Sequence, residues 1–184
     1  MSAPGLILDG DTLSLDVLRR FESARTTVAL SEQARRRMER SIDVVREAVR
    51  TDRVSYGITT GFGAFANKRI SADQVRQLQL NLVRSHACGV GEPLAAPIVR
   101  RMLLLKANSL AAGISGVRTE IVDALLALLN NDVLPVIPSR GSVGASGDLA
   151  PLAHLSLCLI GEGEAVQGER RIEGAEVCRA AGLE

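Results

Sequence analysis

Residues 141–154 read Gly-Ser-Val-Gly-Ala-Ser-Gly-Asp-Leu-Ala-Pro-Leu-Ala-His, a glycine-rich loop that runs directly into an apolar helical stretch. Small neighbours leave the backbone around Ser146 free to bend tightly. Such a bend would let the amide nitrogen of Gly147 reach the carbonyl carbon of Ala145, because neither residue has a side chain large enough to block that approach. Glycine and serine also suit a flexible connector before a capped helix, so composition leaves both interpretations open.

The complete string is similar to the signature of the histidine/aromatic amino acid ammonia-lyase family. In that family the Ala-Ser-Gly triplet cyclises to 4-methylidene-imidazol-5-one (MIO), an electrophile that no standard side chain provides. The resemblance implies that Ala145, Ser146 and Gly147 form this catalytic cofactor, and that neither a metal nor a nucleotide is needed. Asp148 is expected to support the loop as the N-cap of the following helix.

Tyr56, the single tyrosine of the chain, lies in a second informative segment: residues 55–63 read Ser-Tyr-Gly-Ile-Thr-Thr-Gly-Phe-Gly. A tyrosine among three glycines is typical of a loop that can close over a pocket. An ordinary turn whose rings are anchored in the core has the same composition. The segment is similar to the tyrosine loop of the ammonia-lyases, and this resemblance makes Tyr56 the candidate catalytic base.

His86 lies four residues after Leu82, on the expected inward face of a helix near its C-terminus. A core histidine with satisfied hydrogen bonds is the alternative. The surrounding stretch 81–92 resembles the substrate-binding helix of the family. Its Ser-His-Ala form resembles the histidine-specific branch, in which this histidine contacts the substrate imidazole. His154, which lies among leucines, is expected to be structural.

The 184-residue chain has a formal net charge of +1, so no strong field favours nucleic acid or an anionic membrane as a partner. Its first residues lack a leader pattern, and the apolar stretch 149–160 is too short to cross a bilayer, so we expect a cytoplasmic protein. Cys88, Cys158 and Cys178 are odd in number and widely spaced, which favours reduced core cysteines over disulfides. No residue spacing typical of structural zinc is present.

Hydrophobic periodicity and turn residues predict a mainly α protein with small β pieces near both ends. A strand with an Asp-Gly reversal is expected over 6–11, an extended connection after Pro135, and a polar hairpin over 162–172. Ser31 is expected to cap a helix with an apolar stripe of Met38, Ile42, Val45 and Val49. The other predicted helices span 14 or 15 to 23, 71–89 after a capping box at 71–74, 97–113, 119–130, 148 or 149 to 160, and 175–181.

The resemblance also sets expectations for the whole protein. Residues 1–184 would form the N-terminal catalytic-loop lobe of a lyase of roughly 500 residues, whose C-terminal helical bundle is absent here. The complete enzyme is expected to be a homotetramer that converts L-histidine to trans-urocanate and ammonia, the first step of histidine degradation. This stretch alone is expected to be inactive. The alternatives are an MIO-dependent lyase or aminomutase acting on another aromatic amino acid, and a non-catalytic fragment.

Overall fold

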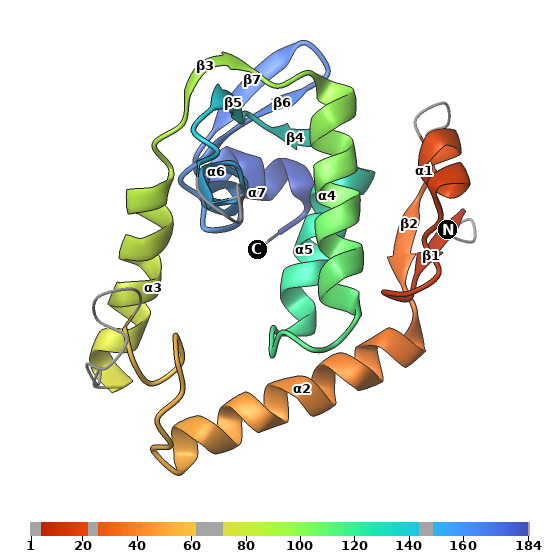
Figure 1. Cartoon of the computed structure of the whole chain (residues 1–184). Helices are drawn as coiled ribbons and strands as arrows, with labels where there is room; N and C mark the ends of the chain where they lie inside the picture. Colours follow the sequence, from red (N-terminus) through yellow and green to blue (C-terminus); the bar gives the residue numbers. More distant parts are fainter. Residues whose placement is uncertain (1–4, 22–25, 62–71, 144–148, 184) are drawn as a thin grey trace.

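A computed structural model of the chain describes residues 5–21, 26–61, 72–143 and 149–183. Helices dominate these residues and the strands are short, which confirms the prediction of a mainly α protein (Figure 1). The helices are α1 (Leu15–Phe21), α2 (Glu32–Arg50), α3 (Ala72–His86), α4 (Ala96–Ala111), α5 (Thr119–Asn130), α6 (Leu149–Leu159) and α7 (Ala175–Ala181).

The strands form three small sheets. The bounds are β1 (Leu6–Leu8), β2 (Val28–Leu30), β3 (Val90–Pro93), β4 (Val133–Pro135), β5 (Pro138–Arg140), β6 (Glu164–Gln167) and β7 (Arg170–Glu173). β1 pairs with β2 in parallel, and β3 pairs with β5 antiparallel. The third sheet is antiparallel with the order β4-β6-β7, and its β6–β7 hairpin confirms the one predicted over 162–172.

The core is built around α4 and α5, which pack side by side (Figure 1). Leu103, Leu104 and Ala107 of α4 are fully buried, as are Val122 and Leu128 of α5. α6, α7 and the third sheet pack against this pair and extend the same apolar cluster. Burial of this continuous apolar surface is the main stabilising term of the fold. None of the described helices is long and apolar enough to cross a membrane.

α2 begins as predicted and departs from the prediction at its end. The Ser31 hydroxyl accepts a hydrogen bond from the amide of Ala34 at 3.1 Å, which confirms the expected N-cap. Met38 and Ile42 are buried, but Val49 is 51% exposed, so the predicted apolar stripe is wrong at its last position. Ala48 is 3% exposed, so in the last turns of α2, which extend past the ends of α4 and α5 (Figure 1), the buried face passes through Ala48 rather than Val49.

Two β features differ from the predictions. The Asp-Gly pair after β1 was expected to reverse the chain, and the parallel pairing of β1 with β2 was not predicted. The Asp9 carboxylate accepts hydrogen bonds from the amides of Asp11 (2.9 Å) and Thr12 (2.8 Å). These bonds hold the turn that connects β1 to α1. β3 was not predicted at all, because Gly91 and Pro93 are residues that strands disfavour.

Candidate active site

The candidate site is centred on the N-terminus of α6, where the chain returns from the glycine-rich loop. Residues 144–148 lie outside the described residues, and with them the predicted positions Ala145, Ser146, Gly147 and Asp148. Both flanks of the loop are described. A Cβ atom at Gly141 would lie 2.9 Å from Gly89 Cα and 3.2 Å from Ala150 Cβ, and Gly141 has φ +142°.

These distances mean that the two ends of the loop meet. Residue 141, where the loop begins, is in contact with the first turn of α6, where the loop ends. Only a glycine fits this close approach and this backbone conformation. The flanks therefore suit a segment whose backbone must fold back on itself, as ring closure between residues 145 and 147 would require.

The segment after α3 is tied to the same junction. The amide of Gly89 donates a hydrogen bond to His154 Nε2 on α6 at 3.0 Å. A side chain at residue 89 would press on this ring nitrogen and on the carbonyl oxygen of Arg140, which would lie 3.0 and 3.2 Å from its Cβ atom. The structural role expected for His154 agrees with this contact. Because Nε2 accepts, the imidazole is neutral with its proton on Nδ1, and burial lowers the pKa of His154 below its ordinary value.

His86 ends α3, three residues before this junction. Its Nδ1 lies 2.8 Å from the carbonyl oxygen of Leu82 and 3.2 Å from Ser85 Oγ. A carbonyl oxygen only accepts, so the contact requires a proton on Nδ1 and leaves Nε2 as the ring nitrogen that faces away from Leu82. The side chain is half-buried rather than enclosed in the core. Ser85 and the Leu82 carbonyl together hold the His86 ring against its own helix, which gives the Ser-His pair a positioning role.

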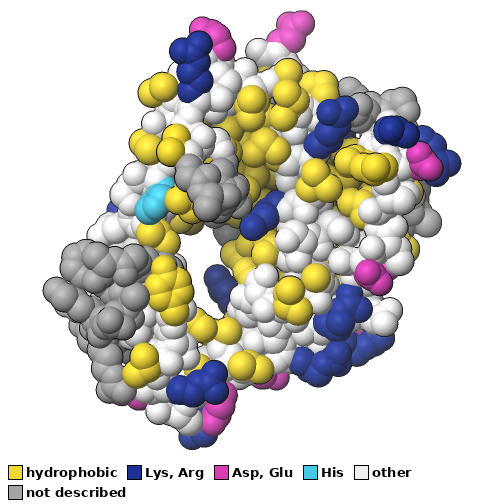
Figure 2. Space-filling model, viewed as in Figure 1, with side chains coloured by type: hydrophobic (Ala, Val, Ile, Leu, Met, Phe, Trp, Pro, Cys, Tyr) yellow, Lys and Arg dark blue, Asp and Glu magenta, His cyan; other side chains and the backbone are white. Residues whose placement is uncertain are grey.

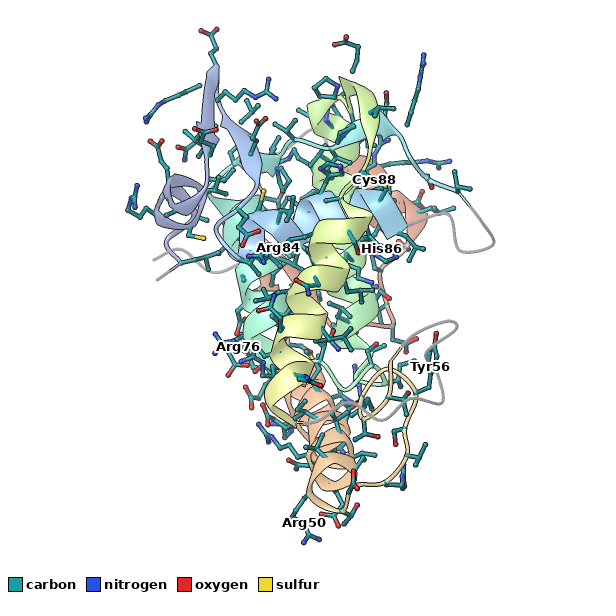
Figure 3. All side chains as sticks on the ribbon, turned by 90° about the vertical axis from the view of Figure 1, so that its left-hand side faces the viewer. Arg50, Tyr56, Arg76, Arg84, His86 and Cys88 are labelled. Atoms are coloured by element: carbon teal, nitrogen blue, oxygen red, sulfur yellow. The ribbon has the colours of Figure 1, made fainter. Side chains whose placement is uncertain are left out.

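Tyr56 is described, and it is 65% exposed. This exposure contradicts the alternative in which its ring is anchored in the core. In Figure 3, Tyr56 lies beside the lower half of α3 and His86 near its upper end, both on the right-hand side of the helix. That side corresponds to the face that Figure 2 presents, where the surface is hollowed between α3, α2 and the α4–α5 pair. The structure thus places Tyr56 and His86 toward one face without bringing them into direct contact.

An ion pair joins the C-terminal part of α3 to the segment that follows α6. Arg84 Nε donates to a carboxylate oxygen of Glu162 at 2.8 Å, which links α3 to the segment after α6. The hydrogen bond with Arg84 lowers the pKa of the Glu162 carboxyl. Both side chains are partly exposed, so this pair orients the two segments more than it stabilises them.

The three cysteines are free thiols, as predicted, but they do not all lie in the core. Cys158 is buried, and burial raises the pKa of its thiol to about 12. Cys178 is half-buried, and its thiol lies 3.5 Å from the carbonyl oxygen of Cys158. Cys88 is exposed, which corrects the expectation of a core cysteine there. The chain has left helix α3 by residue 88, so no helical face buries this side chain.

Two cavities lined by described residues lie away from this junction. One, of about 310 Å³, is lined by residues of β1 and α1, including Leu6 and Phe21. The other, of about 290 Å³, is lined by residues that include Arg100 and Asp132. Neither is lined by Tyr56, His86 or Gly141, so these two cavities are separate from the candidate site.

Comparison with known proteins decides the family. The family described as "Aromatic amino acid lyase" matches residues 13–184. The chain belongs to this family. Among the relatives of this chain, histidine ammonia-lyase of Koribacter versatilis (strain Ellin345) is 52% identical over 178 residues, which cover 97% of this chain and 34% of that protein.

Solved structures agree with this family. Histidine ammonia-lyase from Trypanosoma cruzi matches with a TM-score of 0.86 at 38% identity, over 97% of this chain and 34% of that one. Tyrosine aminomutase from Streptomyces globisporus matches with a TM-score of 0.87 at 35% identity, over 99% of this chain and 34% of that one. This chain therefore has the fold of the corresponding part of these enzymes, and it spans about a third of their length.

Some residues that shape the site could not be found from the sequence. Thr59 is buried in the turn that carries Tyr56, and Gly89, expected only as the end of the predicted helix, lies beyond α3 and contacts His154 of α6. The only signal for Thr59 was its place in the glycine-rich tyrosine segment. Its hydrogen bonds depend on how the turn folds, and they become visible only in three dimensions.

Proposed function

We propose that the complete protein is a histidine ammonia-lyase that eliminates ammonia from L-histidine to give trans-urocanate, the first step of histidine degradation. The observation that carries the proposal is the placement of His86 three residues before the junction of Gly89, Gly141 and α6. Family membership and the identity of 52% to a histidine ammonia-lyase support it. We further propose that the protein is cytoplasmic and forms a homotetramer.

Ala145, Ser146 and Gly147 would hold the MIO group, which supplies an electrophilic carbon that makes the substrate amine a better leaving group. The joined flanks of the loop fit such a group. Asp148 directly precedes Leu149, the first residue of α6, so it occupies the N-cap position in the sequence. Free amides at the start of α6, apart from Pro151 which has no N–H, would favour negative charge near this helix end.

The other steps fall to side chains that the structure describes. Tyr56 would remove the β-proton of the substrate, acting as the general base. His86 would orient the substrate, since its Nε2 can accept a hydrogen bond from the N–H of an imidazole while Nδ1 is held by the carbonyl of Leu82. A phenyl ring offers no donor to this nitrogen, so the contact favours histidine over phenylalanine; a phenol O–H could donate in the same way, and product analysis with tyrosine separates that case.

Replacement of Ser146 in the complete protein tests the proposal. Ser146→Ala should lower kcat for ammonia release from L-histidine by at least about a thousandfold, because the electrophile no longer forms. Ser142→Ala is the matched control, since Ser142 is an exposed serine of the same loop and should leave kcat unchanged. Near-normal turnover of Ser146→Ala would defeat the assignment.

An aminomutase is the second candidate, because a tyrosine aminomutase shares this fold closely. Such an enzyme would return ammonia to the β-carbon of its substrate instead of releasing it. Chromatography of the products formed from histidine and from tyrosine separates the two activities. A β-amino acid product from tyrosine, with no urocanate from histidine, would replace the proposed function with this one.

A further inference from the structure

Tyr56 lies within a tight, hydrogen-bonded turn of the main chain that spans residues 55–59. The amides of Ile58 and Thr59 both donate hydrogen bonds to the carbonyl oxygen of Ser55, at 3.1 and 3.0 Å. Gly57, which follows the tyrosine, has φ +70°. The direction in which the phenol leaves the main chain is therefore set by the backbone of residues 55–59.

One buried hydroxyl, three residues after the tyrosine, bonds the main chain that precedes it. Thr59 Oγ1 donates to the carbonyl oxygen of Arg53 at 2.7 Å and accepts from the amide of Ser55 at 2.9 Å. The Thr59 side chain is 8% exposed, whereas Tyr56 is 65% exposed. A buried hydroxyl with both its donor and its acceptor used holds a backbone in one arrangement, because losing it leaves polar groups without partners.

We propose that Thr59 is a positioning residue for Tyr56, whose hydroxyl fixes the turn that presents the phenol to the substrate. This inference rests on the proposed function, in which Tyr56 is the base. A base must lie within hydrogen-bond reach of the proton that it takes, and small displacements cost large factors in rate. Thr59 touches no reacting atom, so its effect on the reaction passes through Tyr56.

Variants of the complete protein test this role. Thr59→Val keeps the shape of the side chain and removes both hydrogen bonds, so kcat should fall by at least about tenfold while KM for L-histidine changes less than about twofold. Thr59→Ser restores the hydroxyl and should recover kcat to within about threefold of the parent enzyme. Thr51→Val is the matched control, because the Thr51 hydroxyl bonds only the Glu47 carbonyl at the end of α2. It should leave kcat unchanged.

A double substitution separates positioning from a general effect on folding. In a Tyr56→Phe background, Thr59→Val should change the residual single-turnover rate by less than about twofold, because no base remains to be positioned. Equal losses in both backgrounds would overturn the inference. Thr59→Ala replaces Thr59→Val if the latter does not fold. Failure of both to fold would make Thr59 a folding residue and would also overturn it.

The outcomes distinguish this inference from the proposed function. Full activity of Tyr56→Phe would remove the base role itself. An inactive Tyr56→Phe together with a fully active Thr59→Val would leave the proposed function standing and overturn only the role of Thr59.

Discussion

Single polar atoms hold several backbone segments of this chain in place. Ser31 Oγ satisfies an amide at the start of α2, and His154 Nε2 satisfies the amide of Gly89 beside the candidate site. Each side chain comes from a different element, yet each meets a main-chain group that no regular ladder of hydrogen bonds reaches. Such contacts contribute modestly to stability and strongly to local geometry.

The cap of α2 gives a prediction for stability. Ser31→Ala should lower the free energy of unfolding by about 1 kcal/mol, because the amide of Ala34 loses its acceptor. Urea denaturation measures the change. Gln33→Ala, an exposed change in the same first turn, is the control and should cost nothing. Equal stabilities of Ser31→Ala and the parent would show that the cap carries no net energy.

His154 gives a prediction for pH dependence. Its pKa is lowered in the folded chain by burial, so the unfolded chain binds the proton more readily. Its contribution to stability is complete above the ordinary pKa of 6.5 and is lost as the pH falls below that value toward the lowered pKa.

Thermal unfolding between pH 8 and pH 5 tests this contribution. Gln accepts a hydrogen bond and does not titrate, so His154→Gln should lose less stability than the parent as the pH falls. Parallel curves for the two proteins would show that His154 is not responsible for the pH dependence.

At the scale of elements, charged side chains join helices that are distant in the sequence. Arg35 of α2 donates to both carboxylate oxygens of Asp123 on α5, at 2.8 and 2.5 Å. This hydrogen bonding raises the pKa of the Arg35 guanidinium. Arg37, also on α2, donates to the carbonyl oxygens of Ala112 and Asp9. α2 is thus bound to α5, to the end of α4 and to the segment after β1.

The Arg35–Asp123 pair gives a prediction for helix packing. Asp123→Asn should lower the free energy of unfolding by about 0.5–1 kcal/mol, a small figure because both side chains are partly exposed. Asp43→Asn is the matched control, since Asp43 pairs with Arg46 within α2 and joins no second element. The difference between the variants should shrink in high salt. An equal effect of both substitutions would show that the pair does not join α2 to α5.

At the scale of the whole molecule, α3 stands apart from the α4–α5 pair and packs mainly against α6 (Figure 1). No described side chain of α3 is fully buried. The helix that carries His86 therefore presents much of its surface outward in a chain that spans about a third of its relatives' length. This exposure supports the proposal that these 184 residues alone are inactive.

Comparison of the complete protein with this stretch tests that proposal. The complete protein should release ammonia from L-histidine, absorb near about 310 nm, and have a mass about 36 Da below that of its sequence, because ring closure removes two water molecules. Residues 1–184 alone should show no ammonia release. Full activity of the isolated stretch would contradict the expectation.

Local chemistry explains which elements could be predicted. α5 has the predicted bounds, since its apolar period and its flanking residues all lie within one short segment. The β6–β7 hairpin and the Ser31 cap are equally local. The parallel β1–β2 pair and β3 depend on partners distant in the sequence, and neither was predicted.

By itself, the sequence determined the helical class of this protein, most of its element bounds and the family to which residues 141–154 point, because these depend on residue order over one or two turns. Only the tertiary structure decided that Gly89, Gly141 and His154 meet at one junction, that Tyr56 is exposed, and that Thr59 closes the turn beside it. These features depend on contacts and burial that form when distant segments pack. The hydrophobic periodicity of the sequence does not report such contacts.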